Sequence, residues 1–201
     1  MNRDILICGV GGQGTVLASK IIAAAALEEG NAVHSAETIG MAQRGGSVTS
    51  HVRIGENAWS PMIPPGAADI LLAFEPGEAV RNLSYLRLGG IALFSTDAVK
   101  PVTESLKDTG YDGREMAAWL RRKCECILVS AEEACRPFGS SKFFNVIMLG
   151  VAAGSGRLGL GEDTLKRQIE KYVPPKYLEI NIRAFEAGMA LARQAECGEK
   201  E

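Results

Sequence analysis

Residues 4–20 read DILICGVGGQGTVLASK, an apolar run followed at once by a glycine-rich turn and then by good helix formers. The run 4–8 predicts a buried strand, and the alanine-rich segment 15–29 predicts a helix that ends at Gly30. Glycines at such a turn let backbone N–H groups approach an anion at the helix N-terminus. This stretch therefore indicates an α/β fold with a turn suited to a phosphate or carboxylate.

Strand and helix patterns alternate over the first 130 residues, and helices dominate afterwards. The patterns predict strands at 32–36, 48–54, 69–74, 91–95 and 127–129, and helices at 78–88, 114–123, 143–153, 163–172 and 177–194. Segment 48–54 alternates in polarity, so we expect a half-exposed antiparallel strand with His51 on its polar face, either solvated or at an interface. These elements predict a single domain over 1–201: three α/β/α layers, a mostly parallel, Rossmann-like mixed sheet, and a frayed tail at 195–201.

The composition excludes several functional classes. The net charge is −2 over 201 residues with 23% charged residues, and Lys and Arg are scattered, so we expect no nucleic-acid partner. The longest apolar run, near 16–27, is too short for a bilayer, and the N-terminus shows no signal-peptide pattern. We therefore expect no membrane association, and the odd number of cysteines (five) favours reduced thiols in the cytoplasm.

Two of the five cysteines, Cys124 and Cys126, form a C-x-C pair. This spacing is neither the C-x-x-C of a zinc ribbon nor the run of a ferredoxin cluster. We expect no metal and no iron–sulfur cluster in this chain.

The glycine turn taken alone also fits a dinucleotide fold. Gly9, Gly11 and Gly14 have G-x-G-x-x-G spacing, and Glu37 stands 23 residues after Gly14, near the expected end of the second strand. An acidic residue there binds the ribose in dinucleotide folds. A free-standing NAD(P)- or flavin-binding oxidoreductase is therefore the alternative interpretation.

A second glycine-rich stretch, IGMAQRGGSV at 39–48, follows the second predicted strand. The carboxyl ends of parallel strands meet at one edge of a sheet, so this segment and the first glycine turn can face the same crevice. Arg44 would suit a carboxylate or phosphate there, as a bidentate donor. The alternative is a solvated loop in which Arg44 pairs with Glu37.

Five segments occur in an order that resembles a known family: GVGGQG (9–14), IGMAQRGGSVTSHVRIG (39–55), ADILLAFEPGEAVRNL (68–83), KFFNVIMLG (142–150) and NIRAFEAG (181–188). The chain resembles the gamma-type domain of 2-oxoacid:ferredoxin oxidoreductases over about residues 4–190, most closely the branch that acts on indolepyruvate. The pairing of GGQG with QRGGSV and with K-x-x-N-x-x-x-L-G is far more specific than the first motif alone.

The resemblance implies a subunit of an enzyme that oxidatively decarboxylates aryl 2-oxoacids, with coenzyme A as co-substrate and ferredoxin as electron acceptor. It implies that thiamine diphosphate, Mg²⁺ and [4Fe–4S] clusters belong to a larger alpha subunit, and that ferredoxin is reached through the complex. The Gly-Asp-Gly stretch that holds Mg²⁺ in such thiamine sites does not occur here. We therefore expect that this chain binds none of these cofactors alone and is inactive without its partner.

The site residues follow from the same motifs. We expect no catalytic acid or base in this chain, and a cofactor-facing set formed by Gly11, Gly12, Gln13, Gly14, Gln43, Arg44, Gly45, Gly46, Lys142 and Asn145. Lys142 and Asn145 are three residues apart and would share one face of a helix. Alternatively, Asn145 satisfies backbone groups near a helix start.

Overall fold

The computed structural model describes residues 1–38, 45–56, 58–99 and 110–198; Gln43 and Arg44 lie outside these ranges. Its centre is a six-stranded sheet in the order β2-β3-β1-β4-β5-β6. The strands are β1 (Arg3–Val10), β2 (Val33–Thr38), β3 (Ser47–Ile54), β4 (Ala68–Ala73), β5 (Leu86–Ser95) and β6 (Glu125–Val129). Strand β3 runs antiparallel to both neighbours, whereas β1, β4, β5 and β6 pair in parallel.

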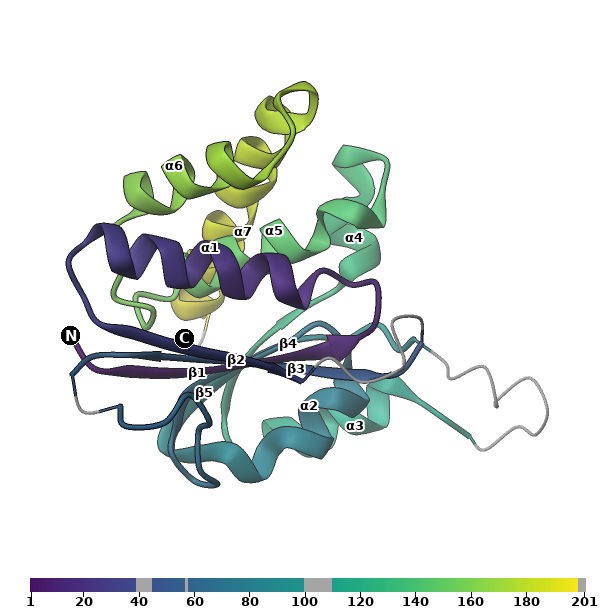
Figure 1. Ribbon diagram of the computed structural model, residues 1–201. Coiled ribbons are helices and arrows are strands. Elements are labelled where there is room, and N and C mark those ends of the chain that lie inside the picture. The colour runs from purple at the N-terminus through teal and green to yellow at the C-terminus, as the bar shows by residue number, and fades with distance from the viewer. Residues whose placement is uncertain (39–44, 57, 100–109, 199–201) are drawn as a thin grey trace.

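Helices cover both faces of this sheet (Figure 1). The upper layer contains α1 (Thr15–Glu28), α4 (Ala131–Cys135), α5 (Phe144–Gly154), α6 (Glu162–Tyr172) and α7 (Leu178–Gly198). The lower layer contains α2 (Pro76–Asn82) and α3 (Gly113–Arg121). The predicted three-layer fold with a mostly parallel sheet and one antiparallel strand near 48–54 is confirmed.

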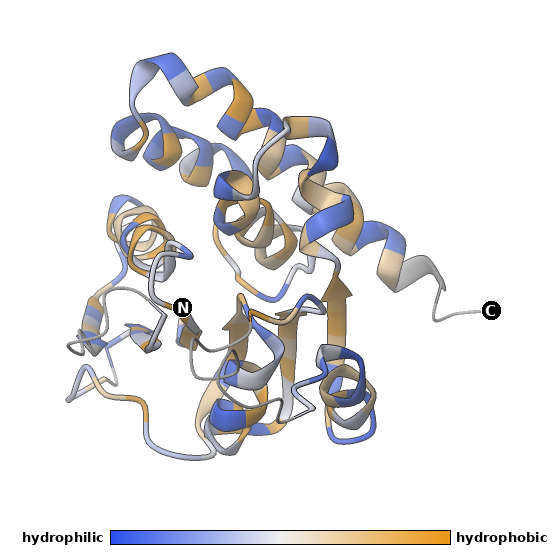
Figure 2. Ribbon diagram, turned by 90° about the vertical axis from the view of Figure 1, so that its right-hand side faces the viewer, coloured by the Kyte–Doolittle hydropathy of each residue, from blue (hydrophilic) through white to orange (hydrophobic). Residues whose placement is uncertain are grey.

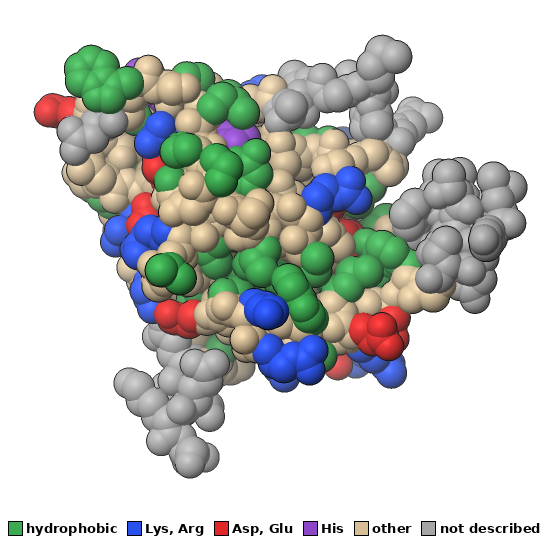
Figure 3. All heavy atoms as spheres, turned by 90° about the horizontal axis from the view of Figure 1, so that it is seen from below, with side chains coloured by type: hydrophobic (Ala, Val, Ile, Leu, Met, Phe, Trp, Pro, Cys, Tyr) green, Lys and Arg blue, Asp and Glu red, His purple; other side chains and the backbone are tan. Residues whose placement is uncertain are grey.

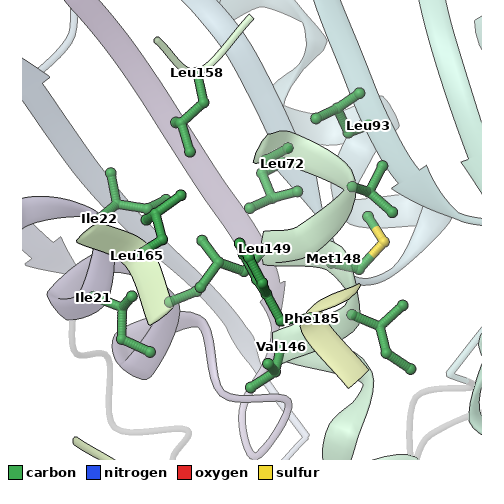
Figure 4. Close-up of a cluster of buried hydrophobic side chains, with 14 of the residues drawn as sticks. Ile21, Ile22, Leu72, Leu93, Val146, Met148, Leu149, Leu158, Leu165 and Phe185 are labelled. Atoms are coloured by element: carbon green, nitrogen blue, oxygen red, sulfur yellow. The ribbon is translucent and has the colours of Figure 1, made fainter. Parts of the chain in front are cut away.

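The core has an upper and a lower part, because successive residues of a strand point to opposite faces. Ile5 and Ile7 of β1 pack upward into the larger cluster, and Leu6 and Cys8 pack downward into the smaller one. In the upper cluster, Leu149 of α5 and Phe185 of α7 meet side chains from α1 and the sheet (Figure 4). The strands are accordingly apolar along most of their length, while the outer helices carry polar faces (Figure 2).

The predicted helix 78–88 is too long. Helix α2 ends at Asn82, and Leu86 already begins β5. Gly89 and Gly90 do not end a helix; they lie inside β5, where Gly89 has φ +74° and the pairing with β4 shifts register. A Cβ on Gly90 would lie 3.0 Å from the carbonyl oxygens of Ala68 and Asp69. The glycine pair therefore serves a close approach of two strands.

The expectation that His51 is solvated is wrong. Its side chain is 2% exposed, because the segment after β3 folds back beneath the sheet. The N–H of Ile63 donates a hydrogen bond to Nδ1 of His51 at 3.2 Å, and the ring of Tyr85 packs edge-on against the imidazole. Burial, and secondarily the charge of Arg53, lowers the pKa of His51.

The lower face of the molecule carries basic and acidic side chains near one another, with apolar side chains between them (Figure 3). In the described part of the chain, no helix combines the length and the apolar character needed to cross a bilayer.

Candidate functional site at the carboxyl edge of the sheet

The first glycine segment forms the turn between β1 and α1, at the edge where the parallel strands end (right side of Figure 1). Gly12 and Gly14 have φ +102° and +84°, a left-handed conformation that favours glycine. The N–H of Gly11 donates to the carbonyl of Gly46 at 2.8 Å. The two glycine segments therefore contact each other through their main chains.

Gln13 holds this turn in place. Its Oε1 accepts a hydrogen bond from the N–H of Val10 at 2.7 Å, and its Nε2 donates to the carbonyl of Phe74 at 3.0 Å. Gly9 leaves room for this side chain, because a Cβ there would lie 2.8 Å from Oε1. Although Gln13 lines the crevice, its amide group is engaged in joining the ends of β1 and β4.

A crevice of about 320 Å³ opens beside the turn. Gly12, Gln13 and Gly14 form one wall, and Lys142 and Asn145 form another. A neighbouring groove of about 410 Å³ shares Lys142 and Asn145 and is otherwise lined mainly by apolar and aromatic side chains, among them Phe143, Tyr172 and Tyr177. Lys142 and Asn145, the pair that the sequence singled out, therefore line both hollows.

Asn145 is the most informative of these residues. Its side chain is 7% exposed, and its Oδ1 accepts a hydrogen bond from the N–H of Val146 at 2.9 Å, as in the backbone-capping alternative. Within the described ranges, its Nδ2 has no acceptor. A Cβ on Gly14 would collide with this amide nitrogen, so glycine is required there for Asn145 to approach the turn. The Oδ1 of Asn145 thus satisfies a backbone N–H in the first turn of α5, and Asn145 lines the crevice.

Two of the remaining groups at the crevice, the N-terminus of α1 and Lys142, favour an anion. Helix α1 has neither a side-chain cap nor an acidic residue in its first turn, so the partial positive charge of its N-terminus is not offset. Lys142 is exposed and has no ion-pair partner among the described residues. Asp97 also lines the crevice and adds a carboxylate to it, whose Oδ2 accepts hydrogen bonds from the N–H of Glu132 at 2.6 Å and from Ser130 Oγ.

Sequence reasoning missed two buried acids next to the crevice. Glu75 is 1% exposed and Glu78 is 5% exposed, both in or beside the first turn of α2. The available signal was the F-E-P-G-E stretch: two carboxylates placed around a helix-starting proline directly after a buried strand. Neither His34, which is exposed, nor His51 joins this edge.

The arrangement does not favour the dinucleotide alternative. Strand β3 is inserted between β1 and β2, so Glu37 lies two strands away from the glycine turn. Its Oε1 accepts a hydrogen bond from Ser19 Oγ of α1 at 3.3 Å. An acid that binds ribose in a dinucleotide fold follows the strand next to the glycine turn, which is not the case here.

In the chain that the structure describes, no group of three or more His, Cys, Asp or Glu side chains is placed to hold a metal ion. Cys8 is fully buried, and burial followed by the charges of Glu78 and Glu75 raises the pKa of its thiol well above the usual value. The side chain of Cys8 is therefore a core residue rather than a nucleophile or metal ligand.

Fold and crevice together define an α/β domain with convergent hydrogen-bond donors at the carboxyl edge of its sheet. The chain belongs to the pyruvate ferredoxin/flavodoxin oxidoreductase family, whose model matches residues 4–191. It is 36% identical to the indolepyruvate oxidoreductase subunit IorB of Thermococcus kodakarensis, covering 95% of this chain and 96% of that protein.

Two solved structures share the fold. One is the gamma subunit of a keto/oxoacid ferredoxin oxidoreductase from Geobacter sulfurreducens, with TM-score 0.69, 22% identity, and coverage of 94% of this chain and 98% of that one. The other is 2-oxoglutarate:ferredoxin oxidoreductase from Magnetococcus marinus, with TM-score 0.74 and 21% identity. The match covers 96% of this chain but 31% of that longer one. The same fold thus occurs both as a separate subunit and as part of a larger chain.

Proposed function

We propose that this chain is the small, cluster-free subunit of a thiamine-dependent 2-oxoacid:ferredoxin oxidoreductase that acts on indolepyruvate and related arylpyruvates. The observation that carries the proposal is the match to an indolepyruvate oxidoreductase subunit over nearly the full length of both chains. The complex would convert the 2-oxoacid to an acyl-CoA and pass electrons to ferredoxin. A larger alpha subunit would carry thiamine diphosphate, Mg²⁺ and the [4Fe–4S] clusters.

The carboxyl-edge crevice supports a role at the boundary with that subunit. Its donors, the first turn of α1, Lys142 and the Nδ2 of Asn145, suit the phosphates of coenzyme A or of thiamine diphosphate. Thiamine diphosphate supplies the carbanion chemistry when it is bound, and this chain's residues bind and orient anionic groups.

The proposal is tested by reconstitution. The chain is co-expressed with a larger thiamine- and cluster-bearing subunit of the same family, and arylpyruvate-dependent reduction of ferredoxin is measured. We expect activity that requires both chains and coenzyme A. Full activity of the larger subunit alone would contradict the proposed role, and micromolar binding of NADH or FAD by the isolated chain would restore the dinucleotide alternative.

A further inference from the structure

Glu75 and Glu78 are buried where an unpaired carboxylate would be costly, so their hydrogen bonds show what they hold. Both lie at the start of α2, below the carboxyl edge of β1 and β4. Their bonds lead to different segments of the chain, and those segments form or adjoin the walls of the crevice.

Glu75 holds the segments that follow β5 and precede α3. Its Oε2 caps α2 by accepting a hydrogen bond from the N–H of Glu78 at 2.9 Å. Its Oε1 accepts from the hydroxyl of Tyr111 at 2.7 Å and from the N–H of Val99 at 3.4 Å. Val99 lines the crevice, so Glu75 connects α2 to one of its walls.

The hydroxyl of Tyr111 is a hydrogen-bond donor to the carboxylate of Glu75. Burial, then the hydrogen bond to Glu75, raises the pKa of its phenol, so the hydroxyl keeps its proton at any working pH. Gly77 makes the approach possible, because a Cβ at that position would collide with the Tyr111 hydroxyl. The E-P-G-E stretch therefore contains both the acid, Glu75, and the glycine, Gly77, that leaves space for the hydroxyl of Tyr111.

Glu78 holds the second glycine segment. Its Oε2 accepts a hydrogen bond from Ser47 Oγ at 2.5 Å, and its Oε1 lies 3.4 Å from Nε of Arg81. Ser47 directly follows Gly46, whose carbonyl accepts from the N–H of Gly11 in the first glycine turn. A chain of contacts thus runs from Glu78 through Ser47 and Gly46 to the main chain of the turn.

We propose that Glu75 and Glu78 are positioning residues: through Tyr111 and Val99 on one side, and through Ser47 and the Gly46–Gly11 contact on the other, they set the shape of the anion-binding crevice. The inference rests on the proposed function for its effect on the KM for coenzyme A. The structural part of the inference is that α2 is coupled to two walls of the crevice, and this part does not depend on which ligand the crevice binds.

The test replaces the donors rather than the buried acids. In the assembled complex, Tyr111→Phe and Ser47→Ala should each raise the KM for coenzyme A about three- to tenfold, the value of one hydrogen bond of about 1 kcal/mol, with kcat nearly unchanged. Ser47→Thr keeps the hydroxyl and should restore the KM. The matched controls Tyr85→Phe and Ser84→Ala, away from the crevice, should leave the KM unchanged. A KM within twofold of the wild-type value in both test variants overturns the inference.

Amide hydrogen exchange on the isolated chain separates this inference from the proposed function. Tyr111→Phe should speed exchange at Val99, and Ser47→Ala should speed exchange at Gly11, because each removes the group that holds the corresponding segment. If the wild-type complex does not oxidise arylpyruvates, the proposed function fails, and these rates decide the inference alone. Faster exchange at both positions supports it, and unchanged exchange at both overturns it.

Discussion

The two edges of the sheet use charged side chains in opposite ways. At the amino edge, Arg53 forms two bonds to Asp4, with Nε to Oδ1 at 2.8 Å and Nη2 to Oδ2 at 3.0 Å. Asp69 accepts from Arg87 at 2.7 Å. At the carboxyl edge, Lys142 and the Nδ2 of Asn145 have no acceptor among the described residues. Both edges are hollowed, by about 210 and 320 Å³, so the presence of a pocket does not distinguish them.

The two edges differ in whether their side-chain hydrogen-bond donors have acceptors among the described residues. A buried or half-buried charge that already has its partner contributes to the fold, whereas a donor held in place without a partner is available to a ligand. Substitutions at the amino edge should therefore change stability, and substitutions at the carboxyl edge should change binding and turnover.

The largest expected effect comes from Asn145→Asp. The new side chain still accepts from the N–H of Val146, but it replaces the Nδ2 donor with a negatively charged oxygen. Loss of a hydrogen bond to a charged ligand, worth about 3 kcal/mol, should lower kcat/KM of the assembled complex roughly 100-fold. The control Asn2→Asp, at the amino-edge pocket, should leave kcat/KM nearly unchanged. Equal losses in both variants would erase the distinction between the edges.

Arg53→Ala should act on stability alone. It removes the paired bonds to Asp4 and the bonds to the carbonyls of Ser60 and Met62. We expect the free energy of unfolding, measured with urea, to fall by about 2 kcal/mol, while the activity of the folded complex is retained. The exposed Arg121→Ala serves as control and should change stability by less than about 0.5 kcal/mol. A stable but inactive Arg53→Ala complex would contradict this division of roles.

Lys142→Ala should raise the KM for coenzyme A about tenfold, which corresponds to about 1.4 kcal/mol for one exposed charge on an anion. Because salt screens exposed charges, the difference from wild type should shrink as ionic strength increases. Lys123→Ala, on the other side of the sheet, is the matched control. A KM that is insensitive to the loss of Lys142 at low salt would remove this residue from the site.

The smallest expected effect is the contribution of His51 to the pH dependence of stability. Its pKa is lowered in the folded chain, so below the unfolded value of about 6.5 the unfolded state takes up a proton that the folded state does not. The contribution of neutral His51 should be complete above about pH 6.5 and lost as pH falls towards the lowered folded pKa. Thermal unfolding between pH 8 and pH 5 measures it, and His51→Gln should reduce the dependence on pH. An unchanged slope in that variant would assign the dependence to other groups.

The sequence was sufficient to predict those elements of the fold that depend on local residue patterns. The strand–glycine turn–helix of residues 4–20 and the antiparallel segment near 48–54 follow from periodicity and glycine spacing, and both occur in the structure. The two features of the fold that were predicted wrongly depend on contacts between distant segments. His51 is buried by a segment ending twelve residues later, and Gly89 and Gly90 adapt β5 to β4.

For the candidate site, too, the sequence predicted local features but not contacts between distant segments. Motif spacing selected Lys142 and Asn145, and the structure brings both beside Gly14. Spacing could not show that the side chain of Gln13 is engaged by the main chain, or that Glu75 reaches Tyr111 across 36 positions. Those roles depend on how the ends of β1, β4 and β5 come together in three dimensions.

The most direct test of the central claim is amide hydrogen exchange of this chain, alone and in the complex with the larger subunit and coenzyme A. The account predicts slower exchange at the glycine turn and the first turn of α1, around Gly12–Val16, and no change around Asp4 and Arg53. Protection confined to the amino edge, with the glycine turn exchanging as in the isolated chain, would contradict it.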